Sequence, residues 1–278
     1  MSINIKNQKI INLKKIIYNT IIQMALNFEN IGTPIAKIID KNKKELNTVY
    51  LADLEIHQKP RHIYETIELQ ANETFQQIPD NRERNILYIT GASGSGKSYY
   101  SADYINQYIK KNPNNEIYLF SSVSDDKVLD KIKKLKRVNI NNEDFLHTEF
   151  DIDDFKNSLL IFDDTDCISN KPLLKKVNEI LDKVLQTGRH VGCTAIYTSH
   201  TACNGKSTKM ILNESHSITF FINGMGGKAM KYLLDQYLGL DKKQIEKVKS
   251  IKSRWITVLK TFPQIVMSQR YMAFTKNL

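Results

Sequence analysis

The chain has 278 residues, of which 41% are hydrophobic, 25% charged and 9% aromatic. This composition is typical of a globular protein and excludes collagen-like and disordered chains. Forty Lys and Arg residues against thirty Asp and Glu give a net charge of +10, which suits a polyanionic partner such as nucleic acid. An AT-rich genome, which enriches Lys, Asn and Ile, is the alternative source of this charge.

Apolar runs and cysteines indicate the compartment. No stretch reaches the roughly 18 unbroken apolar residues of a membrane-spanning helix. The apolar run at residues 10–26 is interrupted by Asn and Lys, unlike that of a signal peptide. Three cysteines without a C-x-x-C pair argue against a disulfide framework and a zinc site. We therefore expect a cytoplasmic protein without a membrane span.

The chain divides into three segments that differ in charge and in the spacing of their apolar residues. Residues 1–46 carry eight Lys against three acidic residues, and apolar residues at helical spacing predict an amphipathic helix in this basic N-terminal extension. Residues 47–84 hold one strand-like run, at 48–56, followed by Pro60 and Pro79. From 85 to 278 strand and helix patterns alternate, which predicts an α/β domain with a mainly parallel central sheet flanked by helices.

The predicted elements of this third segment follow one another at short intervals. In chain order they are strand 86–90, helix 98–110, strand 116–120, helix 126–136, strand 159–162, helix 173–186, strands 193–198 and 218–222, and helices 228–238 and 242–251. The closing runs 255–259 and 265–267 are predicted to form a hairpin or an edge pair.

The segment Gly91-Ala-Ser-Gly-Ser-Gly-Lys-Ser98 matches the phosphate-binding motif G-x-x-x-x-G-K-[ST] between a predicted strand and a predicted helix. Its glycines let the backbone curl so that N–H groups and the helix N-terminus form an anion cradle. Lys97 would reach the β- and γ-phosphates, and the Ser98 hydroxyl would ligate Mg²⁺. The predicted nucleotide-binding residues are Gly91, Ser93, Gly94, Ser95, Gly96, Lys97 and Ser98.

A second apolar strand, Leu159-Leu-Ile-Phe-Asp163-Asp164, ends in two carboxylates. Asp163 at the strand end is predicted to hold Mg²⁺. Asp164 is predicted to act as the general base that activates water for hydrolysis. The alternative role of Asp164 is to cap a turn with Thr165 and Asp166.

Two other nucleotide-dependent classes fit less well. The base-reading motif N-K-x-D of GTPases is missing, because Asn170-Lys171 is followed by Pro172-Leu173. A small-molecule kinase needs an arginine-rich lid, whereas the three arginines other than Arg189 that follow the loop are dispersed. The sequence therefore favours an ATPase that uses ATP and Mg²⁺.

The segment from Thr187-Gly-Arg-His190 to Tyr197-Thr-Ser-His200 leads from a predicted helix into a buried strand with a polar tip. A side chain at that tip, from Thr198, Ser199 or His200, could contact the γ-phosphate. Arg189 is predicted to act on the site of a neighbouring subunit, or alternatively to be a cation at a helix C-terminus. The histidines show no metal-ligand spacing.

Together, G-A-S-G-S-G-K-S, L-L-I-F-D-D, T-G-R-H and the strand ending Y-T-S-H resemble the genome-packaging ATPases of large DNA viruses. These poxvirus-like proteins belong to the FtsK/HerA superfamily, and the resemblance covers about residues 85–270. It implies a homo-oligomeric ring that translocates double-stranded DNA with ATP and Mg²⁺ at subunit interfaces. The chain departs from the superfamily at His200, where Gln is usual, and at Asp164, where Glu is common.

The resemblance also implies a capsid or portal protein as a partner, and the infected cell, its viral factory or the virion as the location. A basic segment at 127–137 and a C-terminal basic region, made of Lys206, Lys209 and the segment 242–254, would bind DNA phosphates in a salt-dependent manner. The alternative is that these clusters are solvated helix faces. We therefore expect a DNA-packaging ATPase. The alternatives are a nucleotide-dependent interaction protein with little turnover and a small-molecule kinase.

Overall fold

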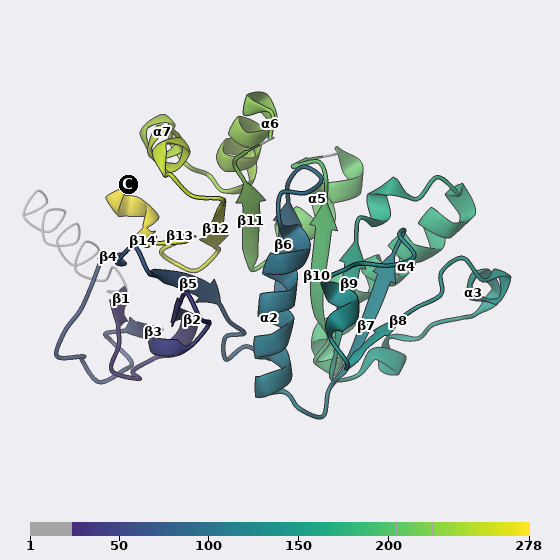
Figure 1. The fold of residues 1–278 in the computed structure, drawn as a ribbon, viewed down its shortest axis with the longest axis horizontal. Coiled ribbons are helices and arrows are strands. Elements are labelled where there is room, and N and C mark those ends of the chain that lie inside the picture. The colour runs from purple at the N-terminus through teal and green to yellow at the C-terminus, as the bar shows by residue number, and fades with distance from the viewer. Residues whose placement is uncertain (1–23, 204, 224) are drawn as a thin grey trace, which may run out of the picture.

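The computed structural model of the chain describes residues 24–203, 205–223 and 225–278. The amphipathic helix expected from residue 10 to Met24 lies outside the described residues up to residue 23, and Met24 itself begins a strand, β1 (Met24–Asn27). A small antiparallel sheet packs beside a large mixed sheet, and helices cover the faces of the large sheet (Figure 1). In the described part of the chain, no helix is both long and apolar enough to cross a membrane.

The small sheet is built by the segment that precedes the phosphate loop. Its strands, in spatial order, are β1 (Met24–Asn27), β3 (Glu45–Asp53), β2 (Thr33–Asp40) and β5 (Glu73–Gln77). All of their pairings are antiparallel. The boundary expected at residue 46 falls inside β3, so residues on both sides of it belong to one sheet.

The large sheet has ten strands. In spatial order they are β4 (Thr66–Glu68), β14 (Tyr271–Phe274), β13 (Ile265–Ser268), β12 (Trp255–Leu259), β11 (Ser217–Phe221), β6 (Ile86–Thr90), β10 (Thr194–Ser199), β9 (Ser158–Asp163), β7 (Glu116–Ser121) and β8 (Leu135–Arg137). The strands from β11 to β8 run parallel, and the remaining four join antiparallel. The predicted α/β fold with a mainly parallel sheet is confirmed, as is the pairing of β12 with β13.

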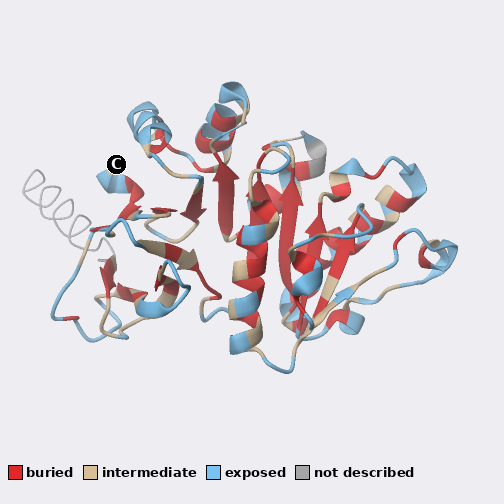
Figure 2. Cartoon of the chain, viewed as in Figure 1, coloured by how far each residue is buried: buried red, intermediate tan, exposed pale blue. Residues whose placement is uncertain are grey.

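The parallel strands are apolar along their length because helices cover both of their faces. All residues of β6, β9 and β10 are buried, and the strands of this region that are visible in Figure 2 are red. On one face lies α2 (Lys97–Lys111), whose side chains pack on β6, β7 and β9 through Tyr100, Tyr104, Ile105 and Tyr108. The other face carries α4 (Lys171–Thr187) and α5 (Lys206–Glu214).

The predicted helix at 126–136 is wrong. The segment forms a single 3-10 turn at Leu129–Lys131 and then the short strand β8. Asp126 Oδ1 accepts hydrogen bonds from the backbone N–H groups of Val128 and Leu129, both at 2.7 Å, and so fixes a turn. β8 then completes the sheet by pairing with β7. Tertiary pairing at a sheet edge thus overrides helical spacing.

The two helices that follow β11 in the chain stand beyond its carboxyl end in Figure 1. The predicted helix 228–238 is α6 (Gly227–Tyr232) followed by a π-helical turn at Leu233–Tyr237. The predicted helix 242–251 is α7 (Lys242–Ser250), which begins with a capping box made by Asp241 and Gln244. A short helix, α3 (Glu143–His147), lies between β8 and β9.

Candidate nucleotide-binding site

The phosphate loop connects β6 to α2 and begins beside the end of β10, where Gly91 N–H donates to the Ser199 carbonyl at 3.1 Å. Gly94 and Gly96 have φ angles of +72° and +115°, in the region that favours glycine. A Cβ atom on Gly91 would lie 2.7 Å from Ser95 Oγ. The glycines therefore permit the tight curl that a phosphate cradle requires.

Lys97 lies at the start of α2, and its side chain is almost completely buried. Its Nζ donates to the Gly91 carbonyl at 3.0 Å and lies 3.2 Å from His200 Nδ1. Asp164 Oδ1 lies 3.6 Å from the same Nζ. The fold thus brings together three residues that are far apart in the sequence and were each predicted to belong to the site.

Asp163 is the last residue of β9 and is 4% exposed. Its Oδ1 accepts a hydrogen bond from Thr198 Oγ1 at 2.8 Å. Burial, followed by repulsion from Asp164, raises the pKa of Asp163 above its ordinary value. Thr198 Oγ1 also lies 3.0 Å from the backbone N of Asp164, so one hydroxyl contacts both acidic residues.

Asp164 adopts a left-handed backbone conformation, with φ of +48°, directly after β9. Asp tolerates this region better than most residues do. Its Oδ2 lies 2.9 Å from His200 Nε2, and its side chain makes no capping hydrogen bond to the turn that follows. The carboxylate therefore faces Lys97 and His200 and does not cap the turn; its role as a general base stays a prediction.

The three candidates at the tip of β10 point in different directions. Thr198 contacts the two carboxylates described above, whereas Ser199 Oγ donates to Asp166 Oδ2 at 2.8 Å. His200 lies between Lys97 and Asp164. Of the three, His200 is therefore the residue that contacts Lys97.

Asp126 was not predicted to belong to the site. Ser98 Oγ donates to Asp126 Oδ2 at 2.9 Å, and the Asp126 carboxylate lies in the turn after β7. No motif spacing marks it, because a loop brings it to the start of α2. The hydroxyl of Ser98 and the carboxylates of Asp163 and Asp126 are hard oxygen donors of the kind that Mg²⁺ prefers. The donor chemistry of these residues fits a magnesium ion.

Two arginines differ in their position relative to the phosphate loop. Arg254 Nη2 donates to the Ser95 carbonyl of the phosphate loop at 3.3 Å, although the sequence grouped it only with a basic segment. Arg189 is exposed, and its Nε lies 3.3 Å from Glu83 Oε2. It precedes β10, whose length of about 17 Å separates it from the loop. Its action on a neighbouring subunit stays a prediction.

No model of a known protein family matches the chain. The uncharacterized protein V3 of the Sputnik virophage is 42% identical over 195 residues, which are 69% of this chain and 78% of V3. The DNA-packaging ATPase B204 of Sulfolobus turreted icosahedral virus aligns with 68% of this chain and 98% of its own, at 16% identity and a TM-score of 0.46.

The cytoplasmic domain of the type VII secretion ATPase EccC of Thermomonospora curvata aligns with 86% of this chain and 28% of its own. Its identity is 12% and its TM-score 0.48. Because of its identity to V3 over more than two thirds of that protein, the chain belongs to the family of viral proteins that includes V3 of the Sputnik virophage.

Proposed function

We propose that this protein is a Mg²⁺-dependent ATPase that drives double-stranded DNA into a viral capsid. The observation that carries the proposal is the grouping of Lys97, Asp163, Asp164 and His200 around one phosphate loop. This grouping supplies a phosphate-binding cation, a metal-binding carboxylate and a second carboxylate for water. Membership of a viral family supports the viral setting.

The backbone N–H groups of the loop and Lys97 would hold the β- and γ-phosphates. Ser98 and Asp163 would hold Mg²⁺, which neutralises phosphate charge during hydrolysis, with Asp126 beside them. Lys97 must turn away from the Gly91 carbonyl and Asp164 to reach a phosphate. This movement frees a carboxylate oxygen of Asp164 to accept the proton of the attacking water.

His200 stands where the superfamily usually has Gln, and we propose that it reports the state of the γ-phosphate. Its Nδ1 lies 3.2 Å from Lys97 Nζ, and its Nε2 lies 2.9 Å from Asp164. A ring that touches both groups is well placed to respond when Lys97 moves to a phosphate.

DNA binding is assigned to the lysines of α6 and α7, which stand on the same side of the large sheet as the phosphate loop (Figure 1). These side chains are exposed: Lys228, Lys231, Lys242, Lys243, Lys247 and Lys249. The other basic segment is less available, since Lys136 pairs with Glu116 at 2.7 Å and Arg137 with Asp130 at 2.7 Å. Exposed lysines on the side of the phosphate loop favour contacts with DNA phosphates.

We further propose that the protein works as a homo-oligomeric ring, with a capsid or portal protein as its docking partner in the infected cell or virion. Arg189 would complete the site of a neighbouring subunit. Its exposed ion pair with Glu83 stabilises the fold little, so Arg189 can exchange this partner for a phosphate.

A second candidate function is a nucleotide-dependent interaction protein with little turnover. It is favoured by the contact between Asp164 and His200, because a general base that stays bound to the imidazole cannot accept a proton from water. In that case ATP binding would drive assembly without hydrolysis.

The test measures the ATPase rate against duplex DNA concentration at two salt levels. We expect DNA-stimulated turnover that weakens with salt and falls about 100-fold or more in Asp164→Asn and Lys97→Ala. Asp153→Asn, an exposed aspartate outside the site, serves as the matched control. An ATPase rate that does not change with duplex DNA concentration would refute the role of a translocase. ATP-dependent oligomers without turnover would select the second candidate.

A further inference from the structure

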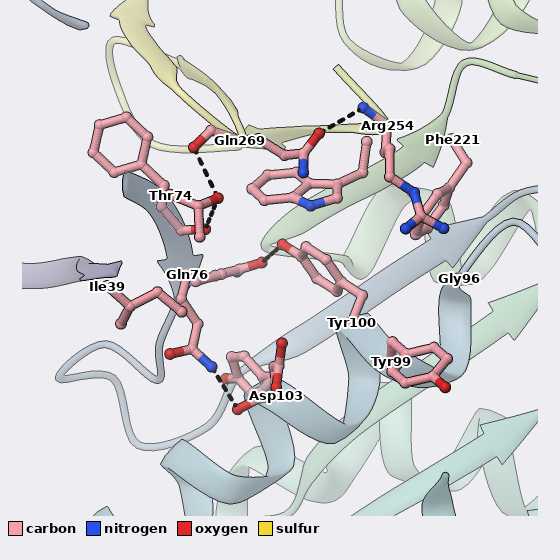
Figure 3. Close-up of a pocket in the computed structure, with 14 residues that line it drawn as sticks. Ile39, Thr74, Gln76, Gly96, Tyr99, Tyr100, Asp103, Phe221, Arg254 and Gln269 are labelled. Carbon is pink, nitrogen blue, oxygen red and sulfur yellow. Dashed lines mark hydrogen bonds between the residues drawn. The ribbon is translucent and has the colours of Figure 1, made fainter. Parts of the chain in front are cut away.

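A cavity of about 430 Å³ opens beside the phosphate loop (Figure 3). One wall is the outer side of α2, with Tyr99, Tyr100 and Asp103. The opposite wall is the small sheet, where β5 contributes Thr74 to Gln77. Gly96, within the phosphate loop itself, lines the cavity. None of the chemistry assigned above to Asp163, Asp164 or His200 uses this space.

We propose that this cavity receives the base and ribose of the nucleotide whose phosphates the loop holds. The inference rests on the proposed function, since it concerns the same bound nucleotide. Pockets for small ligands have volumes of about 300–1,000 Å³, so the cavity has room for a nucleoside. Because Gly96 belongs to both, the cavity and the loop form one continuous site.

Aromatic side chains supply the surfaces that a base needs for stacking. Trp255 at the start of β12 packs against Tyr100, with ring centroids 5.1 Å apart and an interplanar angle of 74°. This tilted contact holds the indole in place at the wall of the cavity. Tyr99 lines the cavity and is 67% exposed, so its ring is accessible to a ligand there. Aromatic rings stack on nucleic acid bases without regard to base identity.

The polar groups of the cavity differ in their availability. The Tyr100 hydroxyl is already engaged, since it donates to Gln77 Oε1 at 2.8 Å and contacts Thr257 Oγ1 at 2.7 Å. Gln269 Oε1 accepts from the backbone N–H of Arg254 at 2.9 Å. Its amide nitrogen points into the cavity in Figure 3 and makes no hydrogen bond within the described ranges. Gln269 thus offers a donor to the base or ribose.

Arg254 joins the two halves of the site. Its guanidinium lies beside Phe221 in Figure 3 and donates to the Ser95 carbonyl of the loop at 3.3 Å. A positive charge at this junction suits the phosphate nearest the ribose. The small sheet then has a function in the nucleotide site, because residues of β5 form a wall that the large sheet does not provide.

The experiment uses the full chain and its single tryptophan, Trp255, as the reporter. Mg²⁺-ATP and Mg²⁺-tripolyphosphate are titrated in parallel, with calorimetry for affinity and tryptophan fluorescence for occupancy of the cavity. Tripolyphosphate offers phosphates without a nucleoside. We expect both ligands to bind through Lys97, and only ATP to change the emission of Trp255.

Two variants probe the cavity directly. Tyr99→Ala removes an exposed ring, and Gln269→Glu keeps the acceptor for Arg254 while removing the donor. Each is expected to weaken ATP binding about fivefold or more and to leave tripolyphosphate binding unchanged. Tyr232→Ala, at an exposed tyrosine of α6, is the matched control.

The outcomes separate this proposal from the proposed function. If both variants bind ATP as the wild type does, or if tripolyphosphate changes the emission of Trp255 as ATP does, the cavity does not hold the nucleoside. That result leaves the phosphate loop assignment intact. If neither ligand binds, or if Lys97→Ala binds both normally, the proposed function fails and this inference fails with it.

Discussion

His216 gives the chain a predictable sensitivity to acid. It lies directly before β11, and its Nδ1 accepts a hydrogen bond from the Ile86 N–H at the start of β6, at 3.1 Å. Burial, assisted by the charges of Arg82, Arg84 and Lys260, lowers its pKa to about 4, whereas Asp80 opposes the shift. The folded protein therefore holds His216 neutral and uses it as an acceptor between two parallel strands.

The sign of the effect follows from proton binding. In the unfolded chain a histidine has a pKa of about 6.5, so between pH 6.5 and 4 the unfolded state binds more protons than the folded state. The stabilisation is complete above pH 6.5 and is lost as the pH falls toward 4. Between pH 7 and pH 5 the loss amounts to about 2 kcal/mol of the free energy of unfolding.

Urea unfolding of the wild type and of His216→Asn at pH 7 and pH 5 tests this reasoning. Asparagine offers an acceptor oxygen close to the position of Nδ1 but does not titrate. The wild type is expected to lose about 2 kcal/mol more than the variant over this interval, because all other titrating groups are shared. Equal losses in both proteins would show that His216 is not held neutral by burial.

Three further changes test other contacts. Thr198→Val removes the hydroxyl shared by the two aspartates after β9 and should lower the free energy of urea unfolding by about 1.5–3 kcal/mol; an unchanged value would refute the shared contact. Arg84→Met removes two hydrogen bonds to carbonyls in the last turn of α4 and should lower the melting temperature by roughly 5 °C in a thermal scan. Asp126→Ala removes the partner of Ser98 and should raise the Mg²⁺ concentration for half-maximal ATPase about tenfold; no change would exclude Asp126 from the metal environment.

The central part of the fold could be predicted from the sequence because its signals are local. Strands covered on both faces appear as short apolar runs, and the helices between them keep their spacing. The phosphate loop is a contiguous motif, and Asp163 directly follows one of those runs. The structure therefore has these residues at the loop and at the strand end where the sequence places them, while their roles stay predictions.

Residues brought in by connecting loops could not be found in this way. Asp126 stands in a segment whose apolar spacing predicts a helix. In the structure the end of this segment pairs with β7 as β8, and the turn before β8 places Asp126 near Ser98. Arg254 belongs to a basic stretch that resembles any solvated surface, yet its guanidinium reaches the phosphate loop. Both contacts depend on chain packing over long sequence separations, which no local pattern encodes.

Of the small sheet only one strand was predicted, the run at 48–56 that overlaps β3, and the other three were missed for a related reason. Its strands mix buried and exposed residues and include bulges near Pro34 and Ile38, which weaken the two-residue alternation. Their apolar side chains, Phe75 among them, are buried against Met272 and Phe274 from the other end of the chain. The stability of this sheet therefore comes from contacts that become visible only once β13 and β14 are in place.

One of these long-range contacts bears on how quickly the protein becomes functional. Thr74 Oγ1 donates to the carbonyl of Gln269 across 195 residues, and β4 pairs with β14 over a similar span. Closing such large loops slows folding, so this junction is expected to form late. A nucleotide that needs the junction for its binding wall would stabilise only the finished fold. ATP should then slow unfolding while leaving the refolding rate unchanged.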